Sequence, residues 1–88
     1  MNAPPVGGSG SRRLGAPKPT SVMPGEGGAP HTVAGATVDS VREEWVVEDR
    51  WWTGSPLRRR YFEVVLADGR NVVVFRDLVA GGWFLQRA

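Results

Sequence analysis

The residues best suited to chemistry in this chain are arginines that lie beside aromatic side chains. The run Arg58–Arg60 directly precedes Tyr61 and Phe62. Cations beside aromatic rings can hold phosphates while the rings stack on bases, as on sheets that bind single-stranded nucleic acid. Arginine, tryptophan and tyrosine are also the side chains most enriched at the energetic centres of protein interfaces. The pattern therefore indicates a binding surface, either for a protein or for nucleic acid.

The four tryptophans extend this pattern, since all of them lie in the last 44 residues. Trp51 and Trp52 are neighbours, so in a strand their indoles would point to opposite faces. We expect Trp45, Trp51 and Trp83 to hold a sheet together. The expected contact residues are Trp52, Arg58, Arg59, Arg60, Tyr61 and Arg76. The alternative for the arginine run is a solvated loop that pairs with the nearby acids and keeps a sheet edge from aggregating.

Residues that would support catalysis are not arranged for it. The available serine, histidine and acid set is Ser40, His31 and Asp39, which lies in or at the edge of a segment expected to be flexible. Nothing there would preorganise a nucleophile. The chain has no cysteine, which excludes disulfides and thiolate metal sites, and its carboxylates lack the spacing of a metal loop. We expect neither an enzyme nor a bound cofactor or metal ion.

Four segments that must position these side chains read as β-strands, at residues 44–52, 60–67, 70–76 and 83–87. Between the second and third segments, Asp68-Gly69 predicts a type I′ hairpin with a two-residue loop. That loop would pair Phe62 with Phe75, and Tyr61 with Arg76 in a cation–π contact. The expected core face then contains Phe62, Val64, Leu66, Val73 and Phe75. We predict an all-β fold, a small four-stranded antiparallel meander or open barrel.

The first half of the chain has a different composition. Residues 1–40 contain eight of the twelve glycines and six of the seven prolines, with no Trp, Phe or Tyr. Such a stretch buries too little apolar surface to offset the entropy of ordering its backbone, about 1–2 kcal/mol per residue. We therefore predict a disordered Gly/Pro-rich tail at residues 1–40 and a small β domain at residues 41–88.

Charge and hydropathy limit the class of partner. The net charge is +2, and residues 41–88 contain eight arginines against seven acids. This balance is not that of a general polyanion binder, which carries a basic stripe. No apolar run reaches the roughly 18 residues of a membrane span, and the N-terminus lacks the apolar centre of a signal peptide. We expect a cytoplasmic protein with no membrane partner.

Taken in order, these motifs resemble a known family. The motifs are Trp45–Trp52, Arg60–Val64, Asp68–Arg70, Phe75–Asp77 and Gly82–Arg87. Their order across residues 44–87 is similar to that of the small bacterial DUF6504-like domain family and of the C-terminal module of ImuB proteins, which are inactive relatives of Y-family polymerases. The resemblance implies an association with damage-induced translesion synthesis, alongside an error-prone polymerase and a RecA-like partner. It supplies no catalytic residues.

Two function hypotheses follow from these observations. The first is a non-enzymatic interaction module that docks on a DNA repair or replication protein and takes part in bacterial DNA damage tolerance. The alternative is a module that binds single-stranded nucleic acid, such as single-stranded DNA, through an aromatic and arginine-rich sheet face. A homodimer is a further option, in which Val65, Val72 and Val74 of two copies cover each other.

Overall fold

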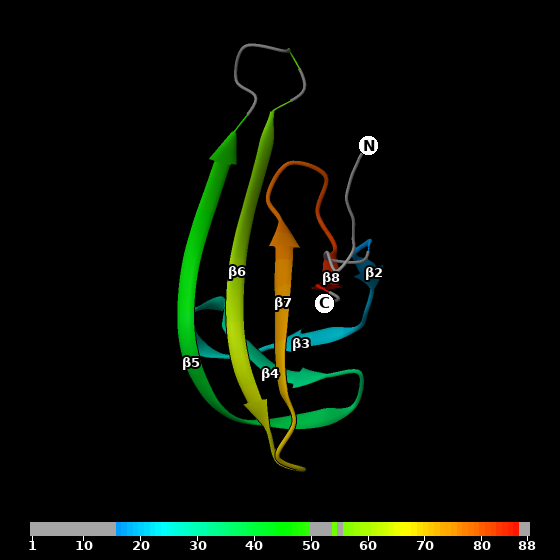
Figure 1. Ribbon diagram of the computed structural model, residues 1–88, viewed down its shortest axis with the longest axis vertical. Helices are drawn as coiled ribbons and strands as arrows, with labels where there is room; N and C mark the ends of the chain where they lie inside the picture. Colours follow the sequence, from blue (N-terminus) through cyan, green and yellow to red (C-terminus); the bar gives the residue numbers. More distant parts are fainter. Residues whose placement is uncertain (1–15, 50–53, 55, 87–88) are drawn as a thin grey trace, which may run out of the picture.

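Seven antiparallel strands form one curled sheet in the computed structural model, which describes residues 16–49, 54 and 56–86. The strand order is β2-β8-β7-β6-β5-β4-β3, and the sheet bends into a half-barrel (Figure 1). The strands are β2 (Lys18–Pro19), β3 (Val22–Pro24), β4 (Pro30–Val33), β5 (Ala36–Asp49), β6 (Leu57–Leu66), β7 (Asn71–Asp77) and β8 (Trp83–Gln86), with a short 3-10 turn, η1 (Glu26–Gly28), between β3 and β4.

The all-β, antiparallel prediction is confirmed, but the predicted number of four strands is wrong. The expected strands correspond to β5, β6, β7 and β8, although β5 begins well before residue 44. The additional strands β2, β3 and β4 lie in the segment predicted to be a disordered tail. That prediction is therefore wrong for residues 18–40, and the expected domain boundary at residue 40 falls inside β5. The prediction for residues 1–15 lies outside the described residues.

The N-terminal strands belong to the fold because they cover its core. Val33 of β4 is only 4% exposed and packs in the same cluster as Phe62 and Val74. A glycine that suggested a linker instead forms a turn, since Gly35 joins β4 to β5 with a φ of +83°. Glycine adopts this conformation at little steric cost. The overall Gly and Pro content does not distinguish turn and core positions from linker positions. It therefore gave no indication of these strands.

The core lies on the face of β6 and β7 that β3 and β4 cross (Figure 1), which we call the inner face. Phe62, Val64 and Val74 are fully buried there, and Leu66 is 2% exposed. Burying such a side chain contributes about 1.5–3 kcal/mol relative to leaving it exposed. The residues that pack around this cluster are Val22, Ala29, Ala36, Val38, Val72, Trp83 and Leu85.

The register of β6 and β7 differs by one residue from the prediction. Phe62 pairs with Val74, and Tyr61 pairs with Phe75. The cause is a three-residue loop, in which the Gly69 N–H donates to the Leu66 carbonyl and the Leu66 N–H donates to the Arg70 carbonyl, both at 2.8 Å. Gly69 has a φ of +92°, whereas Asp68 does not adopt the positive φ that a type I′ turn requires.

A one-residue shift moves side chains to the opposite face of a sheet. Val73 and Phe75 therefore leave the predicted core face, and Val72 and Val74 take their places. The predicted pairing of Tyr61 with Arg76 is also wrong, because Arg76 lies opposite Arg60. The second face of the sheet thus gains an aromatic residue that the sequence assigned to the core.

Candidate binding surface

A row of four aromatic rings crosses the outer face of the sheet, the face opposite the core. Each ring comes from a different strand, and the rings are neighbours by register: Trp45 of β5 opposite Tyr61 of β6, Tyr61 opposite Phe75 of β7, and Phe75 opposite Phe84 of β8. The ring centroids are 5.2 Å, 4.9 Å and 5.2 Å apart in that order. We call these four residues the aromatic row.

The aromatic row is a packed unit. Trp45 and Tyr61 are nearly parallel, with 5° between their planes, and Phe75 and Phe84 are stacked at 19°. Each such aromatic pair contributes about 0.5–1.5 kcal/mol beyond the area that it buries. Phe75 is only 1% exposed because its neighbours enclose it, while the other three rings are half-buried. The aromatic row therefore forms a second apolar layer, on the face of the sheet opposite the core.

Arg59 lies on the aromatic row. Its guanidinium carbon is 4.4 Å from the centroid of Phe75, and its Nη1 donates to the Tyr61 hydroxyl at 3.2 Å. Such a contact with a ring face contributes about 0.5–1 kcal/mol at an exposed site and more when the cation is desolvated. The structure thus brings the predicted contact residues Arg59 and Tyr61 together on the outer face.

The other arginines of the run point to the inner side, because side chains alternate along a strand. Arg60 donates from Nε to Glu44 Oε2 at 2.7 Å and lies 4.9 Å above the ring of Phe62. Arg58 forms an ion pair with Glu48 at 2.5 Å. For these two residues the alternative interpretation, that the run pairs with nearby acids, matches the observed contacts. The run Arg58–Arg60 is consequently not one continuous patch.

The remaining predicted residues are placed as follows. Arg76 is exposed on the inner side of β7, in register with Arg60 and Trp83. Trp83 packs against the core as predicted, 5.8 Å from the ring of Phe62. Trp45, which the sequence predicts to hold the sheet together, forms one end of the aromatic row and stacks on Tyr61. Trp51 and Trp52 lie outside the described residues.

Sequence reasoning missed Phe75 and Phe84 as surface-forming residues. The missing information was the length of the β6–β7 loop, because this sets the face on which Phe75 lies. The Ala67-Asp68-Gly69 sequence is compatible with a type I turn followed by a glycine with positive φ, the commonest three-residue hairpin loop. Choosing that loop would have predicted the aromatic row.

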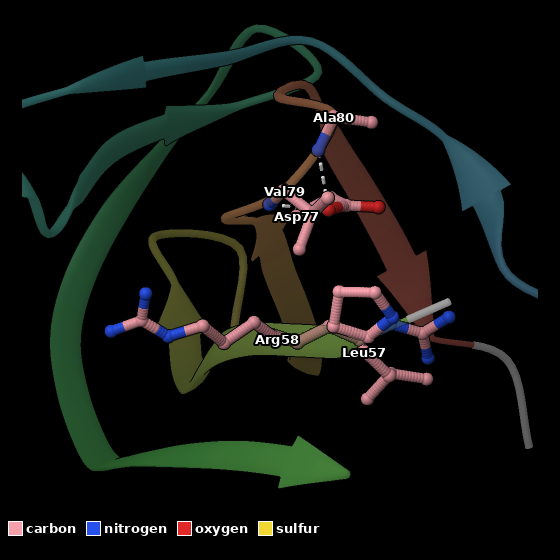
Figure 2. Close-up of a pocket in the computed structure, with 7 residues that line it drawn as sticks. Leu57, Arg58, Asp77, Val79 and Ala80 are labelled. Atoms are coloured by element: carbon pink, nitrogen blue, oxygen red, sulfur yellow. Dashed lines mark hydrogen bonds between the residues drawn. The ribbon is translucent and has the colours of Figure 1, made fainter. Parts of the chain in front are cut away.

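A shallow depression of about 180 Å³ lies at one end of the outer face, beside the turn between β7 and β8 (Figure 2). Asp77 Oδ1 accepts hydrogen bonds there from the backbone N–H groups of Val79 at 2.8 Å and Ala80 at 2.9 Å. The Ala80 and Val79 N–H groups, and then the Arg59 guanidinium, hold the pKa of Asp77 below its usual range. The residues that line the depression are Pro56, Leu57, Arg58, Arg59, Asp77, Val79 and Ala80.

This depression is small compared with the roughly 300–1,000 Å³ of typical ligand pockets. The Asp77 carboxylate there accepts backbone hydrogen bonds and so closes the turn between β7 and β8. Among the described residues, no three His, Cys, Asp or Glu side chains are grouped so as to hold a metal ion. The same part of the chain contains no helix long and apolar enough to cross a membrane.

Compared with this small depression, the aromatic row is the stronger candidate for a functional surface.

Comparisons with protein-family models, with curated proteins and with solved structures find no match for this chain. The family resemblance of residues 44–87 therefore stays a prediction.

Proposed function

We propose that this chain is a non-enzymatic protein-interaction module that binds its partner through the outer face of the sheet. The observation that carries the proposal is the aromatic row, with Arg59 lying on it. Protein interfaces are enriched in aromatic residues and arginine, and their strongest contacts involve Trp, Tyr and Arg. Trp45, Tyr61 and Phe84 are half-buried, so part of each of these rings is open to a partner.

The orientation of the rings favours a protein partner over single-stranded nucleic acid. Bases bind to aromatic side chains by stacking on an open ring face. In the aromatic row, Tyr61 lies between the rings of Trp45 and Phe75, and Phe75 is only 1% exposed, so neither of these two rings offers an open face to a base. Ring edges and the surrounding aliphatic groups suit an apolar protein surface.

The charges on the outer face support the same conclusion. Register places Glu43, Glu63 and Asp77 on the face that carries Tyr61, and Arg59 is the arginine that the described strands add to it. A phosphate backbone would meet more carboxylates than guanidinium groups there. Because phosphate neutralisation provides most of the affinity for nucleic acid, this surface is poorly suited to bind it.

The partner class remains the one implied by the resemblance, a protein of the DNA repair or replication machinery active in damage tolerance. Two matched variants test the surface. Val47→Glu introduces a carboxylate on the outer face, opposite Arg59, and Val46→Glu introduces the same group on the inner side, opposite Arg60. Both positions are on β5 and both have an arginine across the strand pair. Val47 is half-buried and Val46 is 53% exposed, so the melting temperature of each variant is measured to separate a loss of folding from a loss of the interface.

The expected result is that a translesion-synthesis protein co-purifies from DNA-damaged cells with the unmodified chain and with the Val46→Glu variant, and is lost with Val47→Glu. Equal recovery with both variants would contradict an outer-face interface. Fluorescence anisotropy with a labelled single-stranded oligonucleotide tests the alternative. Binding at low salt that weakens steeply as salt rises would favour nucleic acid over a protein partner.

A further inference from the structure

β5 presents a long open edge on the side away from β6. Its partner on that side is β4, which pairs only with Ala36 and Thr37. On the other side, β6 pairs with β5 as far as Asp49. In an antiparallel sheet, alternate residues direct their N–H and C=O groups to opposite edges. Beyond Thr37, β5 therefore directs a row of backbone donors and acceptors towards a side where the described residues place no strand.

The two halves of this open edge differ. Register shifts lie between Val38 and Ser40 and between Val41 and Glu43, and such bulges protect an edge from further pairing. From Glu43 to Asp49 the pairing with β6 is regular and contains no proline. The segment Glu43–Glu48 is thus the part of β5 with the geometry to accept another strand, and we call it the open segment.

The side chains of the open segment favour a basic occupant. β5 carries five acidic residues and one arginine, Arg42, and within the open segment Glu44 pairs with Arg60 and Glu48 pairs with Arg58. Glu43 is exposed, and no arginine of the described residues forms an ion pair with it. An antiparallel second copy centred on the open segment would place Glu43 opposite Glu48, and like charges opposite each other are destabilising. The acidic strand therefore disfavours self-pairing and favours a basic partner.

Trp45 strengthens this preference. Its indole stacks on Tyr61 towards β6, so its second face is directed towards the open edge of β5. A strand added at that edge would place a cross-strand side chain beside this face. An arginine or lysine there would form a cation–π contact, which is strongest with tryptophan.

We propose that the open segment of β5 accepts an extended, arginine- or lysine-rich segment of a partner protein as an additional strand. In this mode, main-chain hydrogen bonds provide affinity and alternate side chains provide specificity. The inference rests on the proposed role as a protein-interaction module, and it names the type of segment that the module would bind.

The test uses the full chain and a capped synthetic peptide in which arginine alternates with valine. Titration calorimetry measures its affinity against a peptide with citrulline in place of arginine and a peptide with glutamate. We expect the arginine peptide to bind, the citrulline peptide to bind roughly tenfold more weakly, and the glutamate peptide not to bind. Failure of the arginine peptide to bind, or equal binding by all three, would overturn the proposal.

Two N-methylated arginine peptides test strand addition itself. Methylating every second amide blocks one edge of an extended peptide, and methylating the alternate amides blocks the other. Strand addition predicts that only one pattern abolishes binding, and that hydrogen exchange slows at Glu43–Glu48 in the complex. Equal effects of both patterns, or protection elsewhere, would overturn it. Val46 and Val47 both lie in the open segment, where an added carboxylate would not repel a basic strand. Loss of the partner with Val47→Glu alone therefore reports on the outer face, and a failed peptide experiment removes only the strand-addition proposal.

Discussion

Replacing Val33 with alanine tests whether the N-terminal strands are part of the folded core. Val33 is 4% exposed and packs with Phe62, Val64 and Leu66. The substitution removes two buried methyl groups, worth about 0.8 kcal/mol each by transfer. The cavity left behind adds to this loss, which gives a total of about 2–3 kcal/mol. For a chain of this size the melting temperature should fall by roughly 10–20 °C.

The assay is urea unfolding followed by tryptophan fluorescence, with Val46→Ala as the control. Val46 is 53% exposed, and its truncation should change the free energy of unfolding by less than about 0.5 kcal/mol. If residues 1–40 were a disordered tail, both variants would unfold at the same urea concentration as the unmodified chain. That result would refute the placement of β4 against the core.

Two further predictions concern turns. Gly69 has a φ of +92°, a region that Asn tolerates better than Ala. Gly69→Ala should therefore destabilise the chain by about 1 kcal/mol or more, and Gly69→Asn by less. Equal urea midpoints for the two variants would argue against the three-residue loop. The pKa of Asp77 is lowered chiefly by the Ala80 and Val79 N–H groups. Its contribution to stability is therefore present above the unfolded pKa of about 3.8 and is lost as pH falls through the lower folded pKa. The Asp77→Asn variant should lose less stability between neutral and acid pH than the unmodified chain, and parallel pH profiles would contradict this.

Local patterns predicted the C-terminal part of the fold well. Alternating apolar residues and the Asp68-Gly69 pair placed β6 and β7 close to their observed bounds, since such signals act over a few residues. The N-terminal strands escaped prediction because their stability comes from long-range packing, as with Val33 against Phe62. Composition carries no information about such contacts.

The candidate surface depended on register, which a sequence specifies weakly when several loop lengths are compatible. Adding one residue to the β6–β7 loop moves Phe75 from the core to the aromatic row. Arg59 and Tyr61 were predicted as contact residues from their residue types, and the structure places them together on the outer face. Because β6 begins at Leu57, Arg58 and Arg60 lie within the strand. Side chains alternate along a strand, so these two arginines lie on the opposite face from Arg59 and Tyr61.

The most direct test of the outer-face proposal is site-specific photo-crosslinking in living cells. A photoreactive residue at Val47 lies on the outer face in register with Arg59, and one at Met23 lies on β3, on the other side of the sheet, where the side chain is 63% exposed. The proposal predicts a specific protein cross-link from position 47 and none from position 23. Equal cross-linking from both positions, or none from position 47, would contradict it.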